Sequence, residues 1–127
     1  MAAIKIEGAE LVVQMEGLAE KMMALRSEVR VPLSHVKGAR AKPAELLDDT
    51  FILRVFGASL TDTHLGYFWK KGEGLVFLDI HHLREGNIVA IDLEHERMKH
   101  LYVEGEHGES AEAIAARILA AIPAPAA

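Results

Sequence analysis

The sequence predicts a single domain that is mainly β, with one amphipathic helix at its C-terminal end. Two observations lead to this prediction. Between residues 4 and 103, short runs in which apolar and polar residues alternate are separated by glycine-rich or charged turns, as in antiparallel sheets. Residues 111–122 instead have the apolar spacing of a helix. We expect roughly seven strands in a bent antiparallel barrel or sandwich, with the helix closing its open end.

The N-terminal part of the chain predicts a β-hairpin, a short helix and an edge strand. Residues 4–6 and 11–15 alternate on either side of Gly8, which is typical of a hairpin. Near residues 16–26, apolar side chains recur at i, i+4 and i+7, which favours a short helix. Alternation returns around Pro32, which indicates a strand end or sheet edge because proline cannot donate a ladder hydrogen bond.

The middle of the chain predicts an acidic loop followed by further strands. Residues 44–50 are acidic and read as a loop, and the apolar run after them is expected to end at Gly57. Turn residues then separate the other extended segments. The strands expected in this region cover residues 51–56, 65–69, 75–80, 88–93 and 101–103.

The C-terminal helix has the clearest pattern. Its apolar residues follow i, i+3, i+4, i+7 and i+8, Ser110 is a suitable N-cap, and Pro123 stops the helix. No repeat or linker interrupts the chain, so we expect one domain over residues 1–123 and a tail over 124–127.

Composition narrows the classes of function. The chain of 127 residues has a net charge of −5, which argues against nucleic acid as a partner. It has no cysteine, which excludes disulfides and thiolate chemistry and fits a reducing compartment. The N-terminus has no signal-peptide pattern, and no apolar run reaches the length of a membrane span, so we expect a cytoplasmic protein. No cofactor is indicated.

Several short segments resemble one family. They are 29–36, 53–57, Gly66-Tyr67 with Gly72, 88–93, and 101–104 before the final helix. In this order they resemble the small bacterial pleckstrin-homology-like domain proteins, over nearly the whole chain. The resemblance implies a bent antiparallel barrel closed at one corner by a helix. It also implies a binding or assembly role, because such folds bind phosphoinositides or peptides or simply assemble.

The first hairpin loop departs from the lipid-binding members of that family. Those members hold inositol phosphates with lysine and arginine, whereas this loop contains Glu7 and Glu10. Two carboxylates repel a phosphate group. Phosphoinositide binding at this loop is therefore disfavoured.

A basic segment is the main candidate for anion binding. Residues 26–42 contain five basic side chains and one acidic one, Glu28. Such a cluster can attract a small anion, or it can be a solvated face of the protein. The basic residues are Arg26, Arg30, Lys37, Arg40 and Lys42.

Seven histidines raise the possibility of a metal site. Spacing weakens it, because His95 and His100 do not match a zincin signature, and His81 and its neighbour His82 point to opposite faces of a strand. Ordinary surface histidines are the simpler interpretation, and no metal site is predicted. The weak candidates are Asp79, His81, His95 and His100.

The aromatic run of Tyr67, Phe68 and Trp69 occupies both faces of one predicted strand. At least one of these rings could lie outside and anchor a partner, with Phe68 and Trp69 as candidates, or the rings could pack in the core. A nearby loop holds Ser59, Asp62 and His64, the residue types of a catalytic triad, but it lacks the glycine pattern of a nucleophile elbow.

The function predicted from the sequence is a non-catalytic binding or assembly module that acts through protein contacts, with a homo-oligomer expected. The alternative is a small-anion or small-ligand binding module that uses residues 26–42. A metal-dependent or hydrolytic enzyme is the remote alternative.

Overall fold

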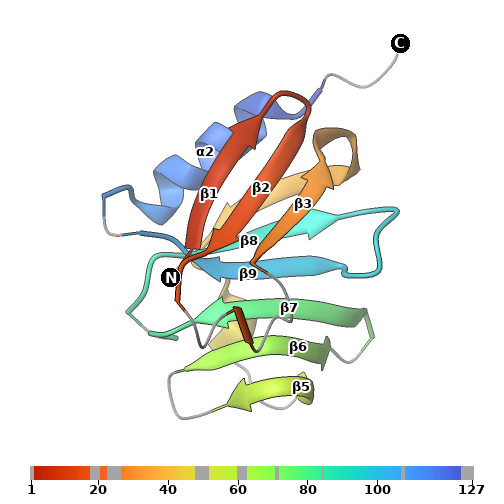
Figure 1. The fold of residues 1–127 in the computed structure, drawn as a ribbon, viewed down its shortest axis with the longest axis vertical. Helices are drawn as coiled ribbons and strands as arrows, with labels where there is room; N and C mark the ends of the chain where they lie inside the picture. The colour runs from red at the N-terminus through yellow and green to blue at the C-terminus, as the bar shows by residue number, and fades with distance from the viewer. Residues whose placement is uncertain are drawn as a thin grey trace.

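The computed structural model of the chain is mainly β with a C-terminal helix, which confirms the predicted fold class (Figure 1). It describes residues 2–17, 21–22, 27–47, 52–59, 63–70, 72–83, 85–106 and 108–123, and for 47 and 52–59 it describes the backbone only. Within these residues the strands form two sheets, one of three strands and one of six, and no closed barrel. A sandwich with a bent sheet fits this arrangement.

The smaller sheet has the order β1-β2-β3, from β1 (Ala2–Glu7), β2 (Glu10–Met15) and β3 (Glu28–Pro32). The predicted hairpin is confirmed: β1 and β2 pair antiparallel around Gly8, whose φ of 59° suits glycine in a tight turn. The prediction for Pro32 is also confirmed, because it is the last residue of β3, an edge strand of this sheet.

The larger sheet has the order β4-β8-β9-β7-β6-β5. Its strands are β4 (Val36–Ala41), β5 (Ile52–Ser59), β6 (His64–Lys70), β7 (Gly74–Ile80), β8 (Ile88–Leu93) and β9 (His100–Glu104). After β7 the chain skips one position before it forms β8, and β9 then fills the gap. As a result β9 is antiparallel to β8 but parallel to β7, which departs from the predicted all-antiparallel arrangement.

Two apolar clusters cover the two faces of the larger sheet. On its inner face Phe77, Ile91 and Leu101 pack against the smaller sheet and the C-terminal helix. On its outer face a second cluster is fully or almost fully buried, and Tyr102 is its largest member. That outer cluster consists of Leu46, Phe68, Val76, Leu78, Ile80, Ile88, Ala90 and Tyr102.

The C-terminal helix α2 (Ala111–Ala121) begins as predicted and buries most of the predicted apolar stripe. The Ser110 side chain accepts a hydrogen bond from the Ala113 N–H at 3.1 Å, which satisfies one free donor of the first turn. Ile114 and Ile118 are buried on the side that faces β4, β8 and β1. Leu119, which the apolar stripe was expected to bury, is 50% exposed.

Three local features differ from the prediction. The strand β4 was not predicted, because its sequence VKGARA is rich in small residues and a bulge between Val36 and Gly38 breaks its alternation. Part of the predicted loop at 44–50 is a 3-10 helix, η2 (Ala44–Leu47), and another 3-10 helix, η1 (Leu33–His35), follows β3. The prediction that Gly57 ends its strand is wrong: Gly57 pairs with Gly66, and β5 continues to Ser59.

The helix predicted near residues 16–26 lies largely outside the described residues. Lys21 and Met22 are helical, and the Lys21 N–H donates to the Gly17 carbonyl at 3.1 Å. The predicted tail, 124–127, is also outside the described part. Over the residues that the structure describes, no helix has the length and apolar character needed to span a bilayer.

Candidate functional site

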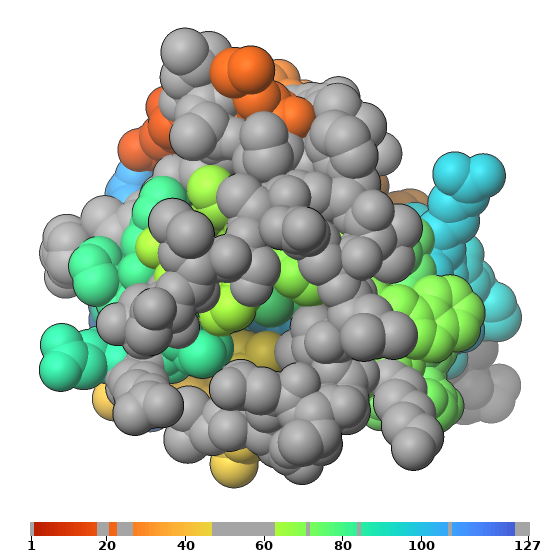
Figure 2. Space-filling model, turned by 90° about the horizontal axis from the view of Figure 1, so that it is seen from below, coloured from red at the N-terminus to blue at the C-terminus, as the bar shows by residue number. Residues whose placement is uncertain are grey.

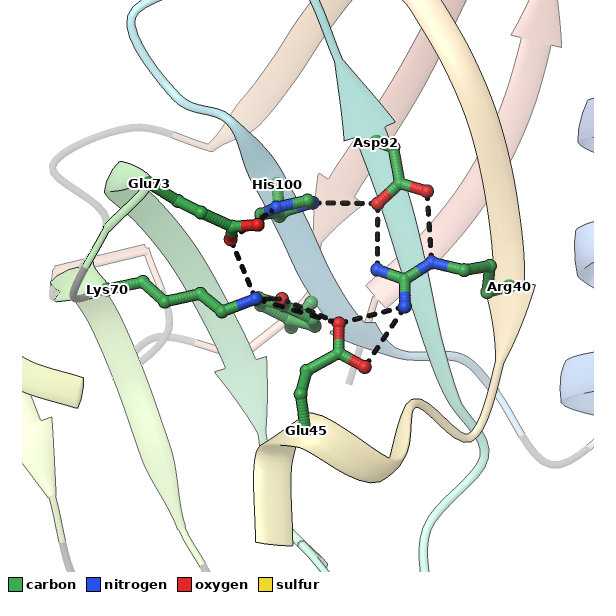
Figure 3. Close-up of polar contacts among 7 residues, drawn as sticks. Arg40, Glu45, Lys70, Glu73, Asp92 and His100 are labelled. Atoms are coloured by element: carbon green, nitrogen blue, oxygen red, sulfur yellow. Dashed lines mark hydrogen bonds and ion pairs between the residues drawn. The ribbon is translucent and has the colours of Figure 1, made fainter. Parts of the chain in front are cut away.

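Six charged or titratable side chains form a closed ring on the outer face of the larger sheet (Figure 3). Acidic and basic groups alternate around it, and each contacts both of its neighbours. We call these residues the polar ring: Arg40, Asp92, His100, Glu73, Lys70 and Glu45. The tightest contacts join Lys70 Nζ to Glu73 Oε2 and His100 Nδ1 to Asp92 Oδ1, each at 2.7 Å.

Strand register places the ring on one face. Asp92 and His100 are directly opposite each other in the β8–β9 pair, and Tyr102 lies two residues along on the same face. Arg40 reaches the ring from β4 and Lys70 from the end of β6. The ring therefore lies at one end of the outer apolar cluster, and its contacts join strands to the β6–β7 turn and to η2.

The electrostatics of the ring favour the ionised form of every acid. Burial alone would raise the pKa of Asp92, but hydrogen bonds from His100 and Arg40 lower it to about 2. Burial alone would also raise the pKa values of Glu45 and Glu73. A hydrogen bond from Arg40 to Glu45 and one from Lys70 to Glu73 instead hold both pKa values below the ordinary one.

The pKa values of Lys70 and Tyr102 are raised, in contrast to those of the acids. Burial works against the charge of Lys70, but hydrogen bonds with Glu73 and Tyr102 raise its pKa. Burial of the phenol raises the pKa of Tyr102 to about 12. At neutral pH Tyr102 is therefore a hydrogen-bond donor.

His100 bridges two carboxylates. Its Nδ1 is 2.7 Å from Asp92 Oδ1, and its Nε2 is 2.8 Å from Glu73 Oε2. Both carboxylates accept hydrogen bonds, whereas a neutral imidazole can donate from only one nitrogen. The two ring nitrogens of His100 connect Asp92 on β8 to Glu73 in the β6–β7 turn.

The position of Asp92 predicts acid sensitivity. Its pKa falls from an ordinary 3.8 to about 2 on folding, so its contribution of about 2 kcal/mol is present above the ordinary pKa and is lost as the pH falls through the lower one. We therefore expect the stability difference between the wild type and Asp92→Asn to narrow by about 2 kcal/mol between pH 5 and pH 2. Urea unfolding across this range measures it, and a difference independent of pH would contradict the prediction.

The structure does not gather the predicted basic segment into one site. Arg30 is on the smaller sheet, where its guanidinium contacts Glu7, Glu10 and Glu28 at 2.9 to 3.5 Å. Arg40 is in the polar ring. An external anion at either guanidinium would have to displace a carboxylate.

The other basic residues of the segment lie apart. Lys42 Nζ is 3.8 Å from Glu112 Oε1 at the first turn of α2, and Lys37 is exposed on β4. Arg26 lies outside the described residues.

The four weak metal candidates lie in three places. At the end of β7, Nε2 of His81 is 3.8 Å from Oδ1 of Asp79. His95, in the β8–β9 connection, contacts the ring of His35 edge-on, and His100 is in the polar ring. Within the described residues, no three His, Asp or Glu side chains are placed to hold a metal ion. Of the triad residue types, the Ser59 side chain and Asp62 fall outside the described part.

Phe68 and Trp69 point to opposite faces of β6, as alternation predicts. Phe68 is 2% exposed in the outer apolar cluster, so it is not a surface residue. Trp69 is 51% exposed. A Cβ placed on Gly74 would lie 3.9 Å from Trp69 Cη2, so the indole rests close to the turn that follows its strand.

Sequence reasoning identified Arg40 and His100 but not their partners. The Lys70–Glu73 contact was within reach because a turn brings residues three apart together. The Arg40–Glu45 and His100–Asp92 contacts join residues five and eight apart, across segments whose path the sequence did not predict. The Arg40–Asp92 and His100–Glu73 contacts join residues 52 and 27 apart. Lys70 follows Phe68 on the same face of β6, and a charged residue at the end of an apolar strand face is a sequence signal for such a site.

Comparisons complete the description of this site. Scans against protein-family models, curated proteins and solved structures found no match.

Proposed function

We propose that this chain is a non-catalytic binding module of the pleckstrin-homology-like type, which acts through protein contacts and associates with a second copy of itself. The mainly β fold with its C-terminal helix supports the fold type. The absence of cysteine supports work in the reducing cytoplasm. The exposure of Trp69 is the observation that carries the proposal.

Trp69 has the properties of an interface anchor. Tryptophan is the residue type most often found at the energetic centre of protein interfaces, and an indole that is half exposed leaves a large apolar surface in water. Leu75, opposite Trp69 on β7, is partly buried against the inner core. The apolar surface is thus continuous from the core to the exposed indole.

A second copy is the partner that the sheet favours. Trp69 is paired with Leu53 of β5, and among the described strands β5 is one of the two edge strands of the larger sheet, with β4 at the other edge. An edge strand presents N–H and C=O groups that a second edge can pair with, and twofold dimers are the commonest homo-oligomers. In Figure 2 the green residues of the β6 end lie beside the cyan residues of the β8–β9 connection, at one side of the molecule.

The internal pairing of charges supports a binding role over catalysis. The acids and bases of the polar ring contact one another, and Arg30 is held by three glutamates. Groups engaged in this way already have partners of opposite charge within the fold.

Comparison of Trp69→Ala with Leu119→Ala tests the proposal. The two side chains are equally exposed, at 51% and 50%, but Leu119 is on α2, away from β6. We expect a wild-type dimer, a dissociation constant raised about 30-fold in Trp69→Ala, since an anchor contributes about 2 kcal/mol, and no change in Leu119→Ala.

Native mass spectrometry and light scattering across a concentration series measure the oligomeric state. A wild-type monomer at about 100 µM, far above the dissociation constant of a specific dimer, would overturn the proposal. So would an equal effect of the two substitutions.

A further inference from the structure

Three donors converge on one carboxylate in the polar ring. Arg40 Nη1 lies 3.0 Å from Glu45 Oε1 and 2.8 Å from Oε2. The Tyr102 hydroxyl donates to Glu45 Oε2 at 3.2 Å, and Lys70 Nζ is 3.7 Å from the same oxygen. A guanidinium, a phenol and an ammonium thus surround a single carboxylate, which is how proteins recognise carboxylate ligands.

The donors and the acceptor differ in how they are held. Arg40, Lys70 and Tyr102 come from three strands of one sheet, and Lys70 Nζ also donates to Tyr102 Oη at 3.1 Å, which fixes two donors relative to each other. Glu45 comes from η2, a four-residue 3-10 helix. The arrangement is a preformed set of donors filled by a side chain from a short separate element.

Burial places Glu45 outside Tyr102 and Lys70 and beside the more exposed Arg40. The Tyr102 side chain is fully buried and the Lys70 side chain is 11% exposed, whereas the Glu45 side chain is 25% exposed and the Arg40 side chain 43%. A carboxylate that arrives from solvent can therefore reach the donors once the Glu45 side chain rotates away, and the donors need not move.

The charges favour a monoanion. Asp92 is bonded to Arg40, and Glu73 is bonded to Lys70, so two carboxylates flank the position that Glu45 occupies. A phosphate dianion there would be repelled by both. A planar carboxylate with one negative charge replaces Glu45 without changing the charge of the ring.

We propose that Arg40, Lys70 and Tyr102 form a binding site for the carboxylate group of a small molecule, and that Glu45 occupies this site when no ligand is bound. Glu45 then acts as a tethered competitor. Its removal exposes a site for a free carboxylate, and an external carboxylate displaces it at high concentration.

Acetate is the probe, and Glu45→Ala is the test variant. We expect the midpoint of thermal unfolding of Glu45→Ala to rise saturably by several degrees as sodium acetate replaces sodium chloride at constant ionic strength, up to about 0.2 M, because a ligand that binds the folded state stabilises it. In the double variant Glu45→Ala/Arg40→Ala, acetate should no longer raise the midpoint of thermal unfolding.

Glu109→Ala is the matched control. Glu109 also contacts a guanidinium with both oxygens, that of Arg117 at 2.9 and 3.1 Å. Within the part of the chain that the structure describes, Arg117 is its only basic partner. We expect no saturable response to acetate in this variant. An equal response in both variants, or one that survives Arg40→Ala, would overturn the proposal.

A direct measurement covers the case in which Glu45→Ala does not fold. Glu45→Gln keeps the size of the side chain and removes its charge, and its amide spectrum can be titrated with acetate. We expect saturable shifts at Arg40, Lys70 and Tyr102 at lower acetate concentrations than in the wild type. The absence of shifts at these residues would refute the site.

Discussion

Replacement of Gly86 with alanine should lower the free energy of unfolding by about 3 kcal/mol and the melting midpoint by roughly 10 °C. A Cβ at this position would lie 2.6 Å from Glu104 Oε1 and 2.6 Å from the His82 carbonyl oxygen. One of these atoms is backbone and the other belongs to a buried carboxylate, so neither can give way easily. The Gly86 N–H also donates to the His82 carbonyl at 2.8 Å, which fixes the loop around the clash.

Gly108→Ala is the control for this prediction. A Cβ on Gly108 would have no heavy atom within 4 Å, and the substitution reduces the freedom of the unfolded chain. We expect its stability to lie within about 0.5 kcal/mol of the wild type. Urea unfolding of both variants measures the difference, and similar stabilities of the two would show that the loop adapts.

The loop that contains Gly86 has a consequence for the candidate site. It is the connection from β7 to β8 that leaves one position in the sheet empty, and β9 fills this position. Both His100 and Tyr102 are on β9. A loop with a different path would therefore separate these residues from Lys70 and Arg40, so the site depends on a turn that contributes no residue to it.

The elements predicted correctly are those fixed by local pattern. The hairpin over 2–15 follows from alternation around Gly8, and α2 follows from its apolar spacing and the Ser110 cap. The strand β4 was not predicted, because Gly38 and two alanines give it little β-forming character. Its place at the sheet edge is set by pairing with β8.

The parallel β7–β9 pair and the polar ring could not be predicted from the sequence for another reason. Register between strands decides both, and register depends on the loop path and on which face each sheet covers. Arg40 and Asp92 are 52 residues apart in the chain. Alternation placed Phe68 and Trp69 on opposite faces, but it could not tell which face the rest of the fold buries.

Glu104 gives the other prediction of large effect. Its side chain is 2% exposed, and Oε1 accepts hydrogen bonds from the N–H groups of His81 and His82 at 3.0 and 2.7 Å. Its Oε2 lies 2.9 Å from His82 Nδ1. We expect Glu104→Ala to lower the free energy of unfolding by about 4 kcal/mol, because it leaves two backbone N–H donors without this acceptor and opens a cavity where the buried side chain was.

Glu104→Gln separates hydrogen bonding from charge. Both backbone N–H groups donate to the same oxygen, so one amide oxygen can accept both bonds, and the amide N–H₂ can donate to His82 Nδ1 in the other imidazole tautomer. The glutamine variant should therefore stay within about 1 kcal/mol of the wild type in urea unfolding. An equal loss in the two variants would mean that the negative charge holds the loop, because the glutamine side chain provides the same acceptor in nearly the same shape.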